Sequence, residues 1–327
     1  MSFFAIMFAL LLEQVRPVAR DNPIHGMLRA WVRGSSRNFD AGKPQHGWLA
    51  WVLAVGVPSL VALGLHWLLV WALGWPVAVV WNVAVLYITL GFRQFSHHFT
   101  EIRDALESGD EPLARELLAQ WQQVDASELP RSEIVRHVIE YSVLAAHRHV
   151  FGVLAWYSVL AALGLGPAGA VFYRLSEFVS RYWAYKARDQ HQPASASLQK
   201  AAANAWTVID WLPARATALG FAVVGSFEDA IDSWRNYAQR FPNDNDGVVL
   251  AATSGALNVR LGGEALKATE ALGYNGATPL ELGIDTESTP GRDPELAHLR
   301  SVVGLVWRAV VLWMGMLALL TLANLLG

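Results

Sequence analysis

The feature that most constrains this chain is a long stretch without charged side chains. Residues 44–92 contain no Asp, Glu, Lys or Arg. One membrane-spanning helix needs about 20 apolar residues, and an unpaired charge in lipid costs several kcal/mol. Because Gly74 and Pro76 interrupt the run, the sequence predicts a hairpin of two spans, at about 48–73 and 76–93.

The composition fits a membrane protein. Hydrophobic residues make up 54% of the chain and charged residues 16%, against about 25% charged in soluble domains. There are 15 Trp residues, a type enriched at membrane interfaces. The net charge of -3 gives no sign of a nucleic-acid partner. With no Cys in the chain, disulfides, thiolate nucleophiles and iron–sulfur clusters are excluded.

A second run without charged residues covers 149–173, and a Gly/Pro turn at 164–167 divides it. The helix predicted after the turn, 168–185, carries Arg174, Glu177 and Arg181. Spacings of three and four place these side chains on one helical face. We therefore expect this helix to cross the membrane only with that face turned toward other helices.

Both ends of the chain are apolar. Residues 301–327 hold one charge, Arg308, and predict a final span. Residues 1–12 are too short for a full span and lack the basic start and cleavage site of a signal peptide, so we expect a partial membrane helix. The predicted fold class is an all-α, polytopic integral membrane protein with four to five membrane helices plus amphipathic cytoplasmic helices.

The same patterns predict an organisation along the chain and an orientation. Arginines and lysines concentrate in 13–47 and 93–148, which the positive-inside rule places in the cytoplasm. We expect a multi-pass protein of the bacterial inner membrane, with 186–300 on the cytoplasmic side. The predicted segments are 1–92 (partial helix, basic loop and hairpin), 93–148 (amphipathic helices), 149–227 (membrane or re-entrant core), 228–300 (soluble helix and loop) and 301–327 (last span).

A charged stripe precedes the second apolar run. Five side chains repeat at steps of three, four and seven along one predicted helix: Glu133, Arg136, His137, Glu140 and His147. Charges that enter a membrane bundle mark a functional site by default. The alternative is the solvated end of a cytoplasmic helix. We also predict no metal site at His97-His98 or His147-x-His149, because neighbouring histidines on a helix point in different directions.

Residues 210–215 (D-W-L-P-A-R) interrupt an apolar stretch from 201 to 227. Pro213 removes a backbone donor, so we expect a kink or a helix that begins near Leu212, with Asp210 as its N-cap. Arg215 would then lie in a first turn, where the helix dipole disfavours a cation. We therefore expect a strong partner for Arg215, either a carboxylate such as Glu177 or a bound anion.

The sequence of this segment resembles a pattern found in a known protein family. Residues 210–219 are similar to the N-x-x-P-A-R-L-T-A pattern of the CobD/CbiB family of integral-membrane cobalamin-biosynthesis proteins. Residues 152–155 (G-V-L-A) resemble the family's D-G-x-x-A-P, and 166–174 resemble its G-P-x-A-x-x-Y-R. The resemblance covers roughly 130–230. It implies the joining of cobyric acid to aminopropanol or its phosphate, with ATP.

The chain departs from that pattern where the family has acids. Five such places hold other residues here: His147, Phe151, Ser180, Trp206 and Thr207. Carboxylates hold the Mg²⁺ of a bound nucleotide. The losses make the chain resemble most closely the AmpE branch of the superfamily, inner-membrane regulatory proteins linked to β-lactamase induction.

Two functions follow as hypotheses. The first is an AmpE-like regulatory or sensing protein that binds a small anionic or zwitterionic ligand, with no cofactor and no enzymatic activity. The second is a cobalamin-biosynthesis synthase with altered residues, which would use ATP and Mg²⁺. The sequence assigns no catalytic residue and leaves the oligomeric state open. The candidate ligand-binding side chains are Arg174, Glu177, Arg181, Asp210, Arg215, Glu140 and His147.

Overall fold

A computed structural model describes residues 2–16, 22–122, 124–188, 194–263 and 287–326. This part of the chain is helical, and its one β-type pairing is a bridge between Val259 and Arg292. Four helical stretches are long and apolar enough to cross a membrane: Pro44–Leu73, Arg131–Ala162, Ala196–Val224 and Leu296–Ala323. The prediction of an all-α, polytopic membrane protein is confirmed.

The chain forms two compact units. Unit 1 contains residues 1–91, 148–213 and 317–327. Its helices are α1 (Ser2–Val15), α2 (Pro23–Phe39), α3 (Pro44–Trp51), the π-helical turn η1 (Val52–Gly56), α4 (Val57–Leu73), α5 (Trp75–Thr89), α9 (Gly152–Ala162), α10 (Ala168–Arg188) and most of α11 (Ala196–Val224).

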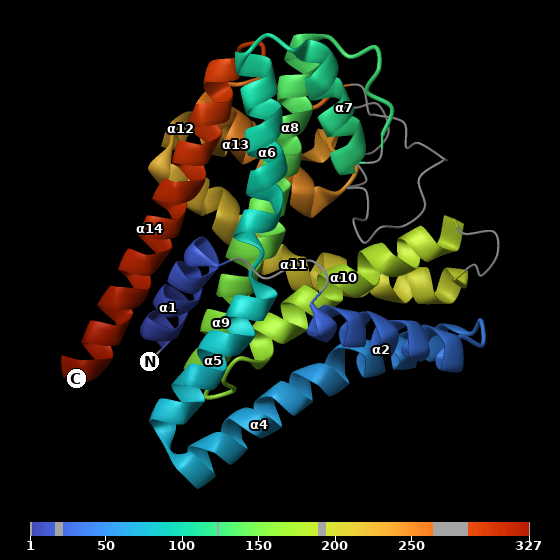
Figure 1. The fold of residues 1–327 in the computed structure, drawn as a ribbon, viewed down its shortest axis with the longest axis vertical. Coiled ribbons are helices and arrows are strands. Elements are labelled where there is room, and N and C mark those ends of the chain that lie inside the picture. The colour runs from blue at the N-terminus through green and yellow to red at the C-terminus, as the bar shows by residue number, and fades with distance from the viewer. Residues whose placement is uncertain (1, 17–21, 123, 189–193, 264–286, 327) are drawn as a thin grey trace. The chain divides into compact units, whose positions relative to one another are not determined.

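Unit 2 contains residues 92–147 and 214–316. Its helices are α6 (Phe92–Glu107), α7 (Glu111–Gln122), α8 (Arg131–Ala146), the last part of α11, α12 (Phe227–Tyr237), the short η3 (Ala238–Arg240), α13 (Asp244–Leu257) and most of α14 (Leu296–Leu326). The π-helical turn η2 (His147–Phe151) joins α8 to α9. In Figure 1, α12 and α13 pack side by side.

Glycine sets the turns of the membrane hairpins. Gly74 has a φ of +85° and ends α4, and Pro76 falls in the first turn of α5. Such a backbone conformation favours glycine, and proline suits the first turn of a helix. The hairpin forms where predicted, but α5 has 15 residues and is shorter than a full span.

Unit 1 brings α9 and α10 together as a close hairpin. A Cβ atom at Gly169 would clash with the backbone of Trp156, and one at Gly152 would clash with the ring of Tyr173. At the turn, Gly166 has a φ of +55°, and an added Cβ would lie 2.5 Å from the His66 ring. Glycine at these positions therefore lets α10 lie directly against α9 and α4.

The soluble segment predicted at 228–300 contains α12 and α13 in unit 2. The α13 helix begins at Asp244, and the side chain of Asn243 accepts a hydrogen bond from the backbone of Asn245. It ends at Leu257, because Asn258 takes the left-handed conformation with a φ of +51°. Residues 264–286 of the predicted segment lie outside the described residues.

Candidate functional site

Three charged side chains form an ion-pair triad on α10. The carboxylate of Glu177 lies between Arg174 and Arg181 and accepts a hydrogen bond from each, with Arg181 at 2.6 Å. The spacing of three and four residues allows these contacts along one helical face. We call Arg174, Glu177 and Arg181 the α10 triad. The structure brings these three predicted site residues together.

The exposure of the triad suits a ligand. The Glu177 side chain is 3% exposed, whereas those of Arg174 and Arg181 are 26% and 22% exposed. The triad has two guanidinium groups for one carboxylate, and both arginine side chains are partly exposed among the described residues. Guanidinium groups bind carboxylates and phosphates through paired hydrogen bonds. An anionic group is therefore the ligand that this arrangement can accept.

A buried tyrosine–carboxylate pair adjoins the triad in sequence. The hydroxyl group of Tyr173 donates a 2.7 Å hydrogen bond to Oδ1 of Asp210, and both side chains are fully buried. The ring centroids of Tyr173 and Trp206 lie 5.2 Å apart. Asp210, another predicted site residue, is thus fixed in the core of unit 1.

The prediction that Asp210 caps a new helix is wrong. The α11 helix runs unbroken through this region, with Pro213 inside it. Proline has no N–H for the carbonyl group four residues earlier, which is that of Ile209. That carbonyl group instead accepts a 2.9 Å hydrogen bond from the indole N–H of Trp156 on α9. The helix tolerates Pro213 because a side chain supplies the missing donor.

The predicted stripe on α8 forms a second buried cluster. Arg136 donates to Glu140 at 3.1 Å and to Glu133 at 2.8 Å, and His137 lies 3.6 Å from Glu140. The backbone N–H of Gly262 also donates to Glu140, at 2.7 Å. We call Glu133, Arg136, His137 and Glu140 the α8 cluster.

The alternative reading of this stripe, as a solvated helix end, is excluded. The side chains of Arg136, His137 and Glu140 are at most 4% exposed. Buried charges are found paired, because unpaired burial is costly. The α8 cluster is therefore part of the packed interior of unit 2.

The remaining two predicted site residues have their own partners in unit 2. Nδ1 of His147 lies 2.9 Å from the hydroxyl oxygen of Thr217. Arg215 donates to the amide oxygen of Asn245 at 3.0 Å. Glu177, which we considered as the partner of Arg215, accepts hydrogen bonds from Arg174 and Arg181. The predicted set therefore does not form one cluster within either unit.

One arginine of the α10 triad, Arg174, influences a histidine on α2. Burial lowers the pKa of His25, and Arg174 and Arg29 lower it further. A hydrogen bond between His25 and the carbonyl oxygen of Ile88 acts in the opposite direction. Since burial and both arginines disfavour the charged imidazole, the pKa of His25 lies below its ordinary value.

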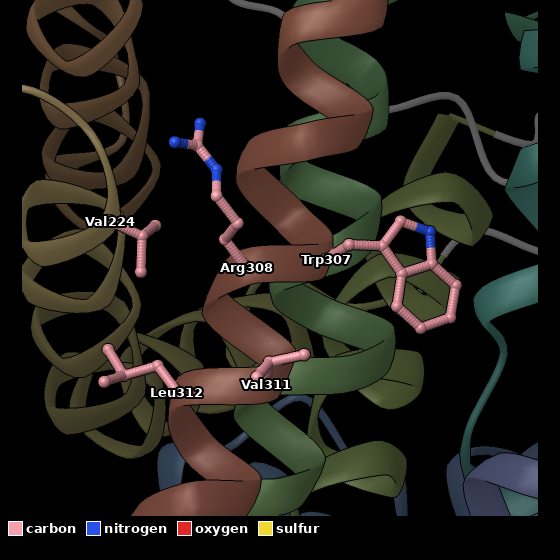
Figure 2. A pocket seen from close by; sticks show the side chains of 5 residues that line it. All are labelled: Val224, Trp307, Arg308, Val311 and Leu312. Atoms are coloured by element: carbon pink, nitrogen blue, oxygen red, sulfur yellow. The ribbon is translucent and has the colours of Figure 1, made fainter.

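An open groove lies elsewhere, between α11 and α14 within unit 2 (Figure 2). It measures about 490 Å³ and is lined by Val224, Trp307, Arg308, Val311 and Leu312. Figure 2 shows Arg308 on the Val224 side of α14 and Trp307 on the opposite side. None of the predicted site residues lines this groove. Its mainly apolar lining fits a surface in contact with lipid.

The described residues contain no preformed metal site built from protein side chains alone. They contain no group of three or more His, Asp or Glu side chains placed to hold a metal. The carboxylates that are present, such as Glu177 and Asp210, are already engaged by arginine or tyrosine. We therefore derive no step of a reaction through a metal–nucleotide complex.

Sequence reasoning missed several partners. Tyr173 was noted as part of the Y-R pattern but not as a site residue, although it binds Asp210. Trp156 stands where the family pattern has proline, and this difference is the signal that could have pointed to its contact with α11. Asn245 and the backbone of Gly262 gave no signal, because both contacts join residues far apart in the sequence.

Fold and site together define a polytopic helical membrane protein with buried arginine–carboxylate clusters. A family model described as "CobD/Cbib protein" matches residues 3–279. The chain belongs to the CobD/CbiB family, as the resemblance over 130–230 predicted. No solved structure matches the chain.

The relatives that carry the name "Cobalamin biosynthesis protein CobD" include the following three. The protein from Stutzerimonas stutzeri is 32% identical over 278 residues, which cover 84% of this chain and 81% of the relative. The protein from Chromobacterium violaceum is 36% identical over 188 residues, 57% of each chain. The protein from Mycobacterium tuberculosis is 29% identical over 234 residues, 70% of this chain and 67% of the relative. Relatives named for a role in β-lactamase induction are not among these three.

Proposed function

We propose that this protein acts in cobalamin biosynthesis, at a step that joins a corrinoid carboxylate to an amine and forms an amide. Family membership and relatives named for cobalamin biosynthesis support this function over the regulatory one. The resemblance stated above gives the reactants, cobyric acid and aminopropanol or its phosphate.

The observation that carries the proposal is the surplus of guanidinium groups in the α10 triad. Cobyric acid supplies a carboxylate and aminopropanol phosphate supplies a phosphate, so both substrates bring anionic oxygens. Arg174 and Arg181 are partly exposed and share one buried carboxylate. A guanidinium group carries five N–H donors in a planar arrangement that matches carboxylate and phosphate oxygens. We assign them to substrate binding and name no catalytic residue.

Amide formation is the first test. The full chain, purified in detergent, is incubated with cobyric acid, aminopropanol phosphate, ATP and Mg²⁺, and the product is followed by mass spectrometry. We expect product in wild type and at least a tenfold loss of kcat/KM in Arg181→Gln. The Stutzerimonas stutzeri relative is the positive control. Omission of ATP in a parallel sample tests whether the reaction depends on the nucleotide.

A second function has two observations in its favour. The five positions of the family pattern that lack acids here include Phe151, Trp206 and Thr207, and the described residues offer no metal-binding group. Under this alternative the protein is an AmpE-like sensor, and the α10 triad binds an anionic ligand without chemistry. Folded protein that makes no product, beside an active relative, would favour the sensor.

The membrane location is part of the proposal. We place the protein in the bacterial inner membrane, with the basic segment 13–47 and the region around residue 270 in the cytoplasm, as the positive-inside rule predicts. Between them, Ala196–Val224 is itself long and apolar enough to cross the membrane. Reporter fusions at residue 270 test this topology. A periplasmic signal from that fusion would overturn it.

A further inference from the structure

The α2 helix presents a stripe of arginines that the fold leaves open. Arg29, Arg33 and Arg37 follow one another at intervals of four residues, so they share one face. The helix contains no Asp or Glu. Within the described residues, none of the three arginines forms an ion pair or a side-chain hydrogen bond. The stripe therefore carries three uncompensated positive charges.

An apolar stripe lies on another exposed face of the same helix. Ile24, Met27 and Trp31 repeat at three and four residues, and all three are exposed, Met27 to 65%. The third face, with Val32, Ser35 and Ser36, is buried. A helix with one buried face, one apolar face and one basic face is typical of the membrane–water interface.

The fold holds α2 beside the start of a membrane span. Four residues separate its last residue from Pro44, where the span Pro44–Leu73 begins. The indole N–H of Trp31 donates to the carbonyl oxygen of Leu53 in that span, at 3.3 Å. Figure 1 shows α2 alongside the helix that leads into α4. The arginine stripe thus lies beside the first part of a 30-residue apolar stretch. Because one span needs about 20 residues, this first part can lie at the level of the lipid headgroups.

We propose that α2 is an interfacial helix that binds the headgroups of anionic phospholipids. The guanidinium groups of Arg29, Arg33 and Arg37 bind phosphate oxygens, while Ile24, Met27 and Trp31 enter the boundary with the acyl chains. An interval of four residues is about 6 Å along a helix, so the stripe contacts more than one headgroup. A zwitterionic headgroup brings its own cation, so charge complementarity selects the anionic lipid. This inference is independent of the proposed enzymatic function.

Lipid competition on the full chain tests the inference. Detergent-solubilised protein is mixed with equal amounts of phosphatidylglycerol and phosphatidylcholine, and bound lipid is counted by native mass spectrometry. We expect wild type to retain severalfold more phosphatidylglycerol. The triple variant R29Q/R33Q/R37Q lowers this ratio at least threefold, and R29K/R33K/R37K keeps most of it because charge is preserved.

Matched controls separate the stripe from total charge. The control variant R103Q/R115Q/R300Q also removes three positive charges, but from arginines that already pair with acids. We expect it to leave the ratio of bound phosphatidylglycerol to phosphatidylcholine unchanged. If the α2 triple variant does not fold, the wild-type ratio is measured in 0.5 M NaCl, where screening must reduce it. An unchanged ratio in the α2 variant or in high salt, equal loss in the control, or displacement of the lipid by inorganic phosphate would overturn the inference.

Discussion

The α8 cluster and the α10 triad use the same residue types in opposite proportions. On α8, one arginine lies between two carboxylates, Glu133 and Glu140, and a backbone N–H adds a further donor to Glu140. On α10, one carboxylate lies between two arginines. The α8 cluster thus pairs one arginine with two carboxylates, whereas the α10 triad pairs one carboxylate with two arginines.

The arginine side chains of the two clusters also differ in their exposure. Arg136 is 4% exposed, but the two arginines of the triad are exposed to more than 20%. The side chains of a buried cluster hydrogen-bond one another and are closed to a ligand, so the main effect of such a cluster is on stability. A partly open cluster with surplus positive charge attracts an anion at the expense of stability. The comparison therefore assigns structure to α8 and binding to α10.

The largest expected effect is that of Glu177→Gln. The substitution leaves Arg174 and Arg181 together without their carboxylate, and breaking a buried pair in this way costs about 3 kcal/mol. We expect the free energy of unfolding in mixed micelles to fall by about that amount. The double variant E177Q/R181Q serves as control, since it removes one of the stranded charges and should recover part of the loss. A cost below 1 kcal/mol would contradict the buried triad.

Glu140→Gln sharpens the comparison with a smaller loss. Glutamine keeps an oxygen to accept from the N–H of Gly262, and Arg136 keeps its bond to Glu133. We expect the free energy of unfolding to fall by about 2 kcal/mol, because one charged hydrogen bond is weakened. Glu133→Gln, at a half-buried position, is the milder control at under about 1 kcal/mol. If Glu140→Gln lowers the free energy of unfolding by more than Glu177→Gln does, the expected order of these two losses is wrong.

Residues near one another in sequence were the ones whose arrangement could be predicted. The α10 triad follows from spacing along one helix, and the hairpin turn follows from Gly74 and Pro76. Both depend on local geometry and on the exclusion of charge from lipid. The family resemblance came from short patterns and agrees with the match over 3–279.

Contacts between distant segments could not be predicted. Sequence alone suggested that Pro213 ends a helix, but the Trp156 side chain compensates for the missing donor. The same applies to Asp210, whose partner Tyr173 comes from α10. The proposed grouping of Arg215 with Glu177 assumed that charges in one apolar stretch meet. Arg215 instead belongs to unit 2 and contacts Asn245 there.

Asp210 allows charge and hydrogen bonding to be separated within unit 1. In Asp210→Ala the buried hydroxyl group of Tyr173 loses its acceptor, which costs about 1–2 kcal/mol of stability. Asp210→Asn keeps an acceptor and introduces the residue of the family pattern, so we expect a loss under about 1 kcal/mol. Both variants are compared by thermal unfolding in detergent. Equal losses in the two would show that the negative charge, and not the hydrogen bond, is what Asp210 supplies.

The smallest expected effect is a pH dependence at His25, which reports the surplus charge of the triad. Burial, Arg174 and Arg29 lower the pKa of His25 below 6.5, so the folded protein binds this proton less readily than the unfolded chain. The contribution to stability is present above pH 6.5 and is lost as the pH falls through the pKa of the folded state. We expect wild type to lose more stability than His25→Gln between pH 7.5 and 5.5.

Arg174→Gln connects this measurement to the comparison of the two clusters. Removal of a positive charge near His25 raises the pKa of the imidazole toward its ordinary value. The stability lost between pH 7.5 and 5.5 should therefore be smaller in Arg174→Gln than in wild type, and the imidazole resonances should titrate at higher pH. Because burial is the largest cause of the shift, part of the pH dependence must remain. An unchanged titration in Arg174→Gln would mean that Glu177 and Arg181 already neutralise the field at α2, and the case for an anion site on α10 would fail with it.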